Sequence, residues 1–166
     1  MNKLSFRERL AQGPILADGA MGTLLHARGG YPIDACFDEL NLSDPDLVLG
    51  IHRAYLEAGA EIIETNTFGA NRFKLSLHGL EASVIEINRA GVALARRAID
   101  EAGRHNVYIG AAIGPLGVRL APVGRVSPQQ VYDAFREQIE ALCEGGADLL
   151  IFETFSDLRE ITQAVR

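Results

Sequence analysis

Residues 14–23 read PILADGAMGT, and this stretch sets how the rest of the chain is interpreted. A short apolar run ends at Asp18 and is followed by two glycines, Gly19 and Gly22. An apolar run that stops at a turn is typical of a buried strand in a parallel sheet. The glycines let the backbone approach a ligand, and ligands of parallel α/β folds bind at the carboxyl ends of strands. We therefore expect a first strand here, with Asp18 at its carboxyl end.

The same plan recurs three more times along the chain. We expect further strands at 61–68, 107–113 and 148–155, and helices at 3–12, 44–58, 82–102, 127–144 and 158–166. Asp44 and Ser127 each precede a proline and fit helix N-caps, whereas residues 24–43 are expected to form a long loop. Strands that alternate with helices at a period of roughly 45 residues indicate parallel strands with right-handed crossovers.

An internal repeat favours a closed barrel over an open sheet. Residues 59–68, GAEIIETNTF, align without a gap with residues 146–155, GADLLIFETF. Alternate strands of a (β/α)8 barrel contribute to the same interior layer, so Asn66 and Glu153 are expected at equivalent positions. The predicted fold class is α/β, of the (β/α)8 TIM barrel family, with this chain as about the first four βα units. Residues 1–166 would then be a truncated N-terminal half whose open strand edges need the remaining half or a second copy.

Composition limits the classes of partner. The net charge is −6 and the pI about 5.2, which argues against nucleic acid and anionic membranes as partners because both need basic patches. No apolar stretch is long enough to span a bilayer. Cys36 and Cys143 stand far apart without CxxC spacing, which suits a reducing cytoplasm and offers neither a disulfide framework nor a metal motif. We therefore predict a cytoplasmic protein.

Two carboxylates are the leading candidates for chemistry. Asp18 and Glu153 both follow apolar strands, and together they could hold an ammonium group, bind a metal or act as an acid/base pair. The backbone N–H groups of Gly19, Ala20 and Met21 could receive a carboxylate or phosphate. An amino acid carries both charges and would suit this arrangement. The structural alternatives are a turn or cap role for Asp18 and an ion pair for Glu153.

Other polar residues carry weaker expectations. Glu64 either points into the barrel or supports the site from behind, while His26 and His78 fall in expected loops and stay open as candidates. His52 falls within a predicted helix and is expected to be structural. Cys143 is expected to pack in its helix as a small apolar side chain.

Five motifs together resemble a known family. In chain order they are ILADGAMGT, DELNLSDPDLV, AGAEIIETNTFGAN, IGAAIGPLG and GGADLLIFETF. They resemble the homocysteine S-methyltransferase domain, which occurs in cobalamin-dependent methionine synthases, in betaine– and S-methylmethionine–homocysteine methyltransferases, and fused to a methylenetetrahydrofolate reductase. DGAMGT with ETNTF looks most like the methionine synthase and reductase-fused branch. The resemblance covers nearly the whole chain.

The resemblance implies a fold and a substrate site. The family fold is a (β/α)8 barrel, and its substrate is L-homocysteine, which becomes methionine. The implied substrate-binding residues are Asp18, Gly19, Ala20, Met21, Asn66, Thr67 and Glu153. The two carboxylates would hold the amino group, the backbone after Asp18 would receive the carboxylate, and Asn66 and Thr67 would line the pocket. In the family a zinc ion binds the sulfur and presents a thiolate that attacks an activated methyl group.

The chain departs from the family pattern in its metal ligands. The family's zinc-binding cysteines come from the second half of the barrel, and Cys36 and Cys143 match none of them. We therefore expect zinc only in a full-length protein, no catalytic or metal residue in this chain, and no activity from these 166 residues alone. Folate or cobalamin could serve the methyl donor, which the sequence does not identify, and a reductase, folate or cobalamin domain could follow.

Two other functions remain open from the residues. One is a different barrel enzyme that uses Asp18 and Glu153 as acid and base on a phosphorylated or carboxylate substrate. The other is a non-catalytic half barrel that serves as an assembly module, which predicts a stable dimer that is indifferent to homocysteine.

Overall fold

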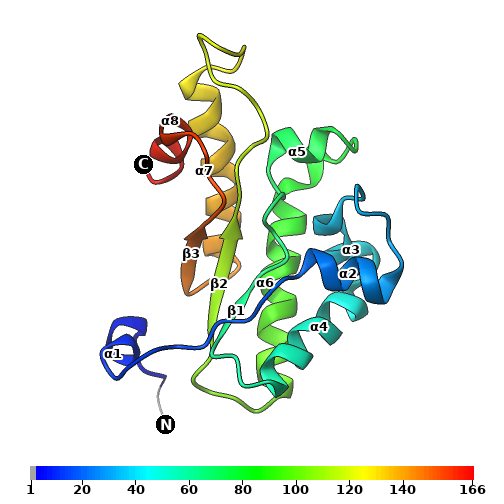
Figure 1. Ribbon diagram of the computed structural model, residues 1–166, viewed down its shortest axis with the longest axis vertical. Coiled ribbons are helices and arrows are strands. Elements are labelled where there is room, and N and C mark those ends of the chain that lie inside the picture. The colour runs from blue at the N-terminus through cyan, green and yellow to red at the C-terminus, as the bar shows by residue number, and fades with distance from the viewer. Residues whose placement is uncertain (1–2) are drawn as a thin grey trace.

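The computed structural model describes residues 3–166 and shows an α/β fold built on a parallel sheet (Figure 1). The strands are β1 (Ile62–Glu64), β2 (Tyr108–Ile113) and β3 (Leu149–Phe152), in the order β1-β2-β3. Ile63 pairs with Ile109 and Ala111 with Leu150, and both ladders are parallel. The prediction of parallel strands separated by helices is confirmed, while barrel closure stays a prediction. The expected domain 1–166 includes residues 1 and 2, which lie outside the described residues.

The predicted first strand is reduced to one bridge beside β1. Ala17 pairs with Ile62 in parallel, Ile62 N–H donates to the Leu16 carbonyl at 3.1 Å, and Asp18 N–H donates to the Ile62 carbonyl at 3.0 Å. The direction and the neighbour are as expected. The prediction that this stretch is buried is wrong, since Leu16 is 56% exposed. The stretch runs along the outer edge of β1 and has no strand on its other side among the described residues.

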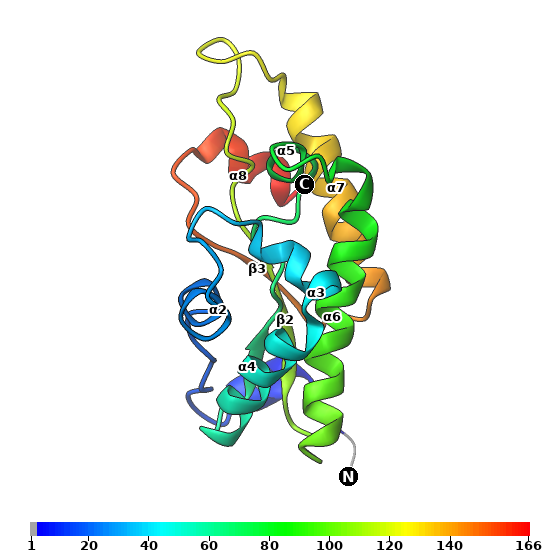
Figure 2. The same ribbon diagram turned by 90° about the vertical axis from the view of Figure 1, so that its right-hand side faces the viewer.

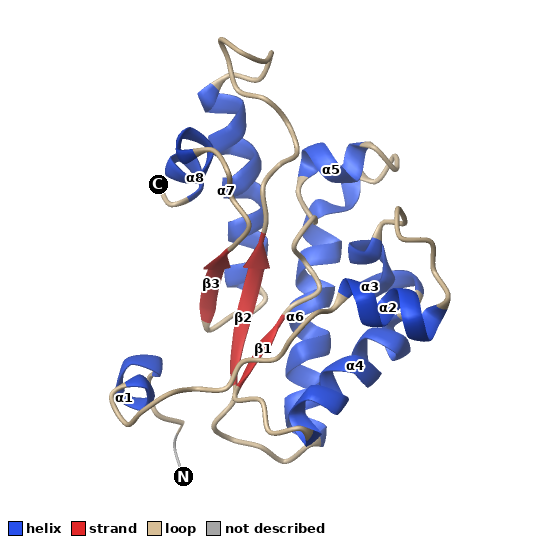
Figure 3. Ribbon diagram, in the orientation of Figure 1, coloured by secondary structure: helices blue, strands red, loops and turns tan. Residues whose placement is uncertain are grey.

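The main helices form where their caps and apolar periodicity predict. The helices are α1 (Phe6–Leu10), α2 (Gly22–Gly29), α3 (Leu40–Ser43), α4 (Pro45–Glu57), α5 (Arg72–Ser76), α6 (Val84–Glu101), α7 (Pro128–Glu144) and α8 (Leu158–Ala164). Two 3₁₀ turns, η1 (Phe37–Glu39) and η2 (Glu81–Ser83), join them. Asp44 accepts from Leu47 N–H at the start of α4, and Ser127 with Gln130 forms a capping box at the start of α7. Figure 3 shows how short the strands are beside these helices.

The expected long loop at 24–43 is wrong. It holds most of α2, then η1 and α3, and the following expected loop holds α5. These pieces are short, and the glycines and proline between them hide their periodicity. Gly30, at φ 71°, ends α2 in the left-handed conformation that glycine adopts without strain.

The core lies between the sheet and one layer of helices. Figure 2 shows α4, α6 and α7 side by side along the strands. Every residue of β2 is buried, because β2 has a strand on each side and helices against it. At the amino end of β2, the Tyr108 ring meets Phe6 edge-on at 5.4 Å and its hydroxyl donates to the Leu4 carbonyl at 2.9 Å. These contacts fix α1 beneath the sheet.

The outward sides of the long helices are polar. Ion pairs join α4 to α6 through Arg53 and Glu101, and α6 to α7 through Arg89 and Glu144. Surface pairs of this kind add little stability. Cys143 is also exposed on α7, so the prediction that it packs as an apolar side chain is wrong. Within residues 3–166, no helix has both the length and the apolar character needed to cross a membrane.

The chain leaves β1 through a buried, irregular segment that needs hydrogen-bond donors. We call residues Thr65–Asn71 the β1 exit segment. Its carbonyls at Asn66, Thr67 and Ala70 each accept from a side-chain amide on a different helix. The donors are Asn41 of α3 at 2.8 Å, Gln138 of α7 at 2.8 Å and Asn88 of α6 at 2.7 Å. Asn41, Asn88 and Gln138 are buried, so these bonds replace the water that a surface loop would use.

The hydrogen bonds that Asn41 and Gln138 make to the β1 exit segment predict different losses of stability when each side chain is replaced. Asn41→Leu should lower the free energy of unfolding by about 2–4 kcal/mol, because it removes three buried hydrogen bonds, to Asn66 and Ile87, and takes the side-chain donor from the buried Asn66 carbonyl. Gln138→Met should cost about 1 kcal/mol, because it loses one bond to Thr67 and also removes the unpartnered Gln138 Oε1. Urea denaturation of both variants would measure the order, and equal losses would contradict the role of the Asn41 hydrogen bonds.

His52 predicts a pH dependence of stability. It is fully buried in α4, neither ring nitrogen has a partner among residues 3–166, and burial lowers its pKa to about 4 from 6.5. The unfolded chain therefore binds more protons between pH 6.5 and 4, and stability falls as pH drops through this window. His52→Leu should remove about 3 kcal/mol of the loss between pH 7 and 4, as measured by urea denaturation at both pH values.

The exposed His105 supplies the matched control. Replacing a solvated histidine removes no burial penalty, so His105→Leu should keep the wild-type loss of stability on acidification. The buried carboxylates titrate in both proteins and cancel in the comparison. A His52→Leu variant that loses as much stability as wild type would show that His52 is not the group responsible.

Candidate functional site

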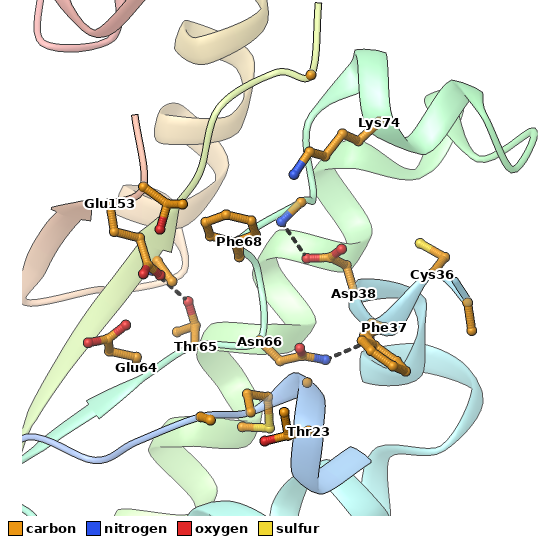
Figure 4. A pocket seen from close by; sticks show the side chains of 18 of the residues that line it. Thr23, Cys36, Phe37, Asp38, Glu64, Thr65, Asn66, Phe68, Lys74 and Glu153 are labelled. Atoms are coloured by element: carbon orange, nitrogen blue, oxygen red, sulfur yellow. Dashed lines mark hydrogen bonds between the residues drawn. The ribbon is translucent and has the colours of Figure 1, made fainter. Parts of the chain in front are cut away.

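A cavity of about 880 Å³ lies where the strands end. Its walls come from residues 18–23 before and within α2, from the turn around η1, from the β1 exit segment and α5, and from the ends of β2 and β3 (Figure 4). The sequence-predicted residues that line it are Asp18, Gly19, Ala20, Met21, Asn66 and Glu153. Segments far apart in the sequence thus bring six of the seven predicted residues to one cavity.

Thr67, the seventh predicted residue, does not line the cavity. It is fully buried, and its hydroxyl donates to the Ala112 carbonyl of β2 at 2.9 Å. The Thr65 hydroxyl lies 2.5 Å from the Thr67 hydroxyl and accepts from Ala112 N–H at 3.2 Å. Thr67 therefore ties the β1 exit segment to β2 and supports the cavity floor from beneath.

Three carboxylates share one side of the cavity. Asp18 Oδ2 accepts from Glu64 N–H at 2.9 Å, while the buried Asp18 Oδ1 has no partner among residues 3–166. Burial raises the pKa of Asp18 to about 7, and the charges of Glu64 and Glu153 act in the same direction, against the Glu64 N–H bond. Burial and the Glu153 charge also raise the pKa of Glu64. This side of the cavity therefore favours a cation.

Backbone donors lie on the neighbouring wall. Met21 is the N-cap residue of α2 and makes no side-chain cap. The N–H groups of Gly19, Ala20 and Met21 have no acceptor among residues 3–166, and all three residues line the cavity. The Ala20 carbonyl accepts from the Tyr55 hydroxyl at 2.9 Å, which holds this turn in place. Free N–H groups at the positive end of a helix favour an anion.

The two walls together suit a zwitterion. Carboxylates on one wall can accept from an ammonium group, and the N–H groups at the start of α2 on the neighbouring wall can donate to a carboxylate. An α-amino acid carries both groups on one carbon, so it can engage both walls at once. The structural alternative for Glu153, an ion pair, does not form within residues 3–166, where its carboxylate pairs with no basic side chain.

The described residues do not supply a metal site. No group of three or more His, Cys, Asp or Glu side chains among residues 3–166 is arranged to hold a metal ion. Cys36 lines the cavity, where burial raises the pKa of its thiol, but Cys143 lies outside it. His78 lines the cavity, whereas His26 contacts the Tyr31 carbonyl elsewhere. The zinc that the family resemblance implies thus finds no ligand set in this part of the chain.

Several cavity residues were missed by sequence reasoning. Asp38 Oδ1 accepts from Gly69 N–H at 2.8 Å, and burial raises the Asp38 pKa to about 6. Phe68 and Lys74 also line the cavity, with the Lys74 Nζ over the Phe68 ring (Figure 4). Asp38 and Lys74 lie in the short helical elements η1 and α5, where the sequence predicts loops. Their position in the sequence could have identified them, because segments that follow the ends of strands in a parallel sheet face the ligand site.

Comparisons with known proteins agree on one family. The family model described as homocysteine S-methyltransferase matches residues 15–166. The methionine synthase of Mycobacterium leprae is 36% identical over 168 aligned positions, which cover 95% of this chain and 14% of that protein. The methionine synthase of Mycobacterium tuberculosis is also 36% identical and covers 94% of this chain and 14% of its own length. The chain therefore spans a small part of these curated relatives.

Solved structures give the same result. The metallated form of the homocysteine methyltransferase MmuM from Escherichia coli superposes with a TM-score of 0.79 at 30% identity. Its oxidized form superposes with a TM-score of 0.81 at 29% identity. Both alignments cover 95% of this chain and 59% of the MmuM chain. Because the family model matches nearly the whole sequence, this chain belongs to the homocysteine S-methyltransferase family.

Proposed function

We propose that this chain supplies the homocysteine-binding pocket of a methyltransferase that converts L-homocysteine to methionine. The observation that carries the proposal is the buried Asp18 Oδ1, which has no partner among residues 3–166 and lies with Glu64 and Glu153 on one wall of the cavity. A buried carboxylate oxygen without a donor is costly, and a substrate ammonium group removes that cost.

The amino acid part of homocysteine engages both walls. Its ammonium donates to Asp18 Oδ1 and to Glu153, and Glu64 adds negative charge beside them. Its carboxylate accepts from the N–H groups of Gly19, Ala20 and Met21. Asn66 keeps its place in the lining because its amide donates to the Phe37 carbonyl at 2.7 Å, and Thr67 acts from beneath.

The reaction forms a sulfur–carbon bond to the methyl group as the bond between methyl and donor breaks, and the substrate thiol loses its proton. In the family, zinc would favour the thiolate form of the sulfur. No residue set described here holds that metal, so we assign no step to zinc within this chain. We also propose that methyl transfer needs further residues of a longer protein, and that these 166 residues alone are inactive. The residues that support this proposal do not identify the methyl donor. They do not indicate whether folate or cobalamin carries the methyl group, or whether a methylenetetrahydrofolate reductase is fused to the domain.

The fold proposed for the complete domain is a (β/α)8 barrel. The similarity to MmuM over 59% of its length supports it. So does β3, whose outer edge has no partner strand within residues 3–166 and whose Leu150 is 36% exposed. Further strands of a barrel, or a second copy of the chain, would pair with this edge.

A second candidate is an acid/base role for Asp18 and Glu153 on a different substrate. It is favoured by the Asp18 pKa of about 7, which is suited to proton transfer near neutral pH. The two proposals differ in one measurement, because only the first requires L-homocysteine to bind in this cavity.

Glu153→Ala should weaken L-homocysteine binding by about 1.5–3 kcal/mol, the usual value for a hydrogen bond to a charged group. Isothermal titration calorimetry on the natural, full-length protein measures it. Glu57→Ala, at an exposed position on α4, is the matched control and should bind as wild type does. Unchanged affinity in Glu153→Ala would remove Glu153 from the site.

Binding should also depend on pH through Asp18. An ammonium group binds the ionised carboxylate, and the pKa of Asp18 is raised to about 7, so affinity rises as pH rises toward neutrality. Between pH 5.5 and 7.5 the ionised fraction of a group with this pKa grows about 25-fold. L-methionine is a suitable probe because it has no thiol to titrate. Its affinity should rise in wild type and stay nearly flat in Asp18→Asn, and a flat wild-type profile would contradict the role of Asp18.

A further inference from the structure

Among the described residues, one lysine lines the cavity, and it lies across the Phe68 ring from Glu64 and Glu153. Lys74 extends from α5, and Figure 4 shows its amino end directed toward Phe68, with Glu64 and Glu153 on the other side of that ring. Its Nζ lies 4.4 Å from the centroid of the Phe68 ring. A Cβ at Gly69 would come within 2.7 Å of Asp38 Oδ2 and 3.3 Å of Lys74 Cδ, so this glycine leaves room for both side chains. The shape of the cavity wall thus delivers this ammonium group into the cavity.

The ammonium group of Lys74 has neighbouring charges but no acceptor. The charges of Asp38 and Glu160 raise its pKa, although burial, the larger effect, lowers it. Neither carboxylate lies within 4.0 Å of it, and each already accepts a backbone N–H, Asp38 from Gly69 at 2.8 Å and Glu160 from Leu116 at 2.7 Å. Within residues 3–166, Lys74 Nζ donates to no oxygen. Its three N–H donors are therefore available to a ligand.

The cavity has room for more than one amino acid. Pockets of about 300–1,000 Å³ normally take drug-sized ligands, and this cavity of about 880 Å³ is near the upper end of that range. An amino acid held between Asp18 and the start of α2 fills only part of it. Methyl transfer needs a second molecule, the donor, in the same space as the substrate sulfur.

We propose that Lys74 and Phe68 form a subsite for an oxyanion, a carboxylate or a phosphate, on the methyl-donating substrate. This inference rests on the proposed function and adds the chemical class of the second substrate. The ammonium of Lys74 binds the oxyanion, and the Phe68 ring packs against the adjoining part of the donor. The oxyanion would occupy the side of the cavity that is farther from Glu64 and Glu153, where it would share the ammonium of Lys74 with the charges of Asp38 and Glu160.

The sequence offers a direct measurement. Lys3 and Lys74 are the lysines in these 166 residues, and Lys3 is paired with Asp148 at 2.7 Å. Reductive methylation with ¹³C-formaldehyde keeps the lysine charge and gives each lysine an NMR signal. On the natural, full-length protein, we would titrate acetate and, separately, inorganic phosphate at constant ionic strength with chloride, with and without saturating L-homocysteine. The Lys74 signal should shift saturably and its pKa should rise, while the Lys3 signal stays still.

Variants make the outcome decisive. Lys74→Arg identifies the signal by removing it, and Lys74→Met should weaken anion binding at least tenfold in calorimetry. Arg72→Met, two residues earlier on α5 and paired with Glu137 on the outer surface, is the matched control and should bind as wild type. Saturation by acetate alone or by phosphate alone would select the class of donor. A Lys74 signal that stays still, or moves only as Lys3 does, would overturn the subsite. Homocysteine calorimetry on the same samples tests the proposed function separately.

Discussion

The architecture of the site depends on satisfying the backbone of one buried segment. After β1 the chain turns through Thr65–Asn71 inside the protein, where water cannot supply donors. Helices α3, α6 and α7 each contribute one side-chain amide to a carbonyl of this segment. The floor of the cavity is therefore held by side chains that do not line the cavity themselves, and Asn66 and Phe68 take their positions from it.

The same region also keeps polar atoms unpaired. Within residues 3–166, the buried Asp18 Oδ1, Asn88 Oδ1 and Gln138 Oε1 have no hydrogen-bond donor. Buried polar atoms without partners cost stability, so a protein retains them where another gain offsets the cost. At Asp18 the proposed gain is a place for the ammonium group of a ligand. For Asn88 and Gln138, the gain is the hydrogen bond that the nitrogen of each side-chain amide donates to the β1 exit segment.

Local signals predicted much of the fold, and their failures have physical causes. Asp44 and Ser127 gave α4 and α7 because a cap and a following proline act locally. The strand at 14–18 was read as buried because its pattern is apolar, but exposure is set by neighbouring strands that a local pattern does not reveal. The residues around Asp38 and Lys74 were read as loop because helices of one or two turns carry too little periodicity. Thr67 follows Asn66 in sequence, yet the chain turns its side chain into the core toward Ala112.

The charged side chains of the cavity are unevenly distributed between its two sides. Asp18, Glu64 and Glu153 raise the local cost of negative charge, while the only lysine among the described lining residues extends from α5 beyond Phe68. A substrate that binds by its ammonium group is drawn to the first side, and an oxyanion is repelled from it. Two molecules with opposite charges at their outer ends would therefore bind at opposite sides of the cavity. Their uncharged parts would meet between the two sides. That meeting point is where a sulfur and a methyl group have to come together for transfer.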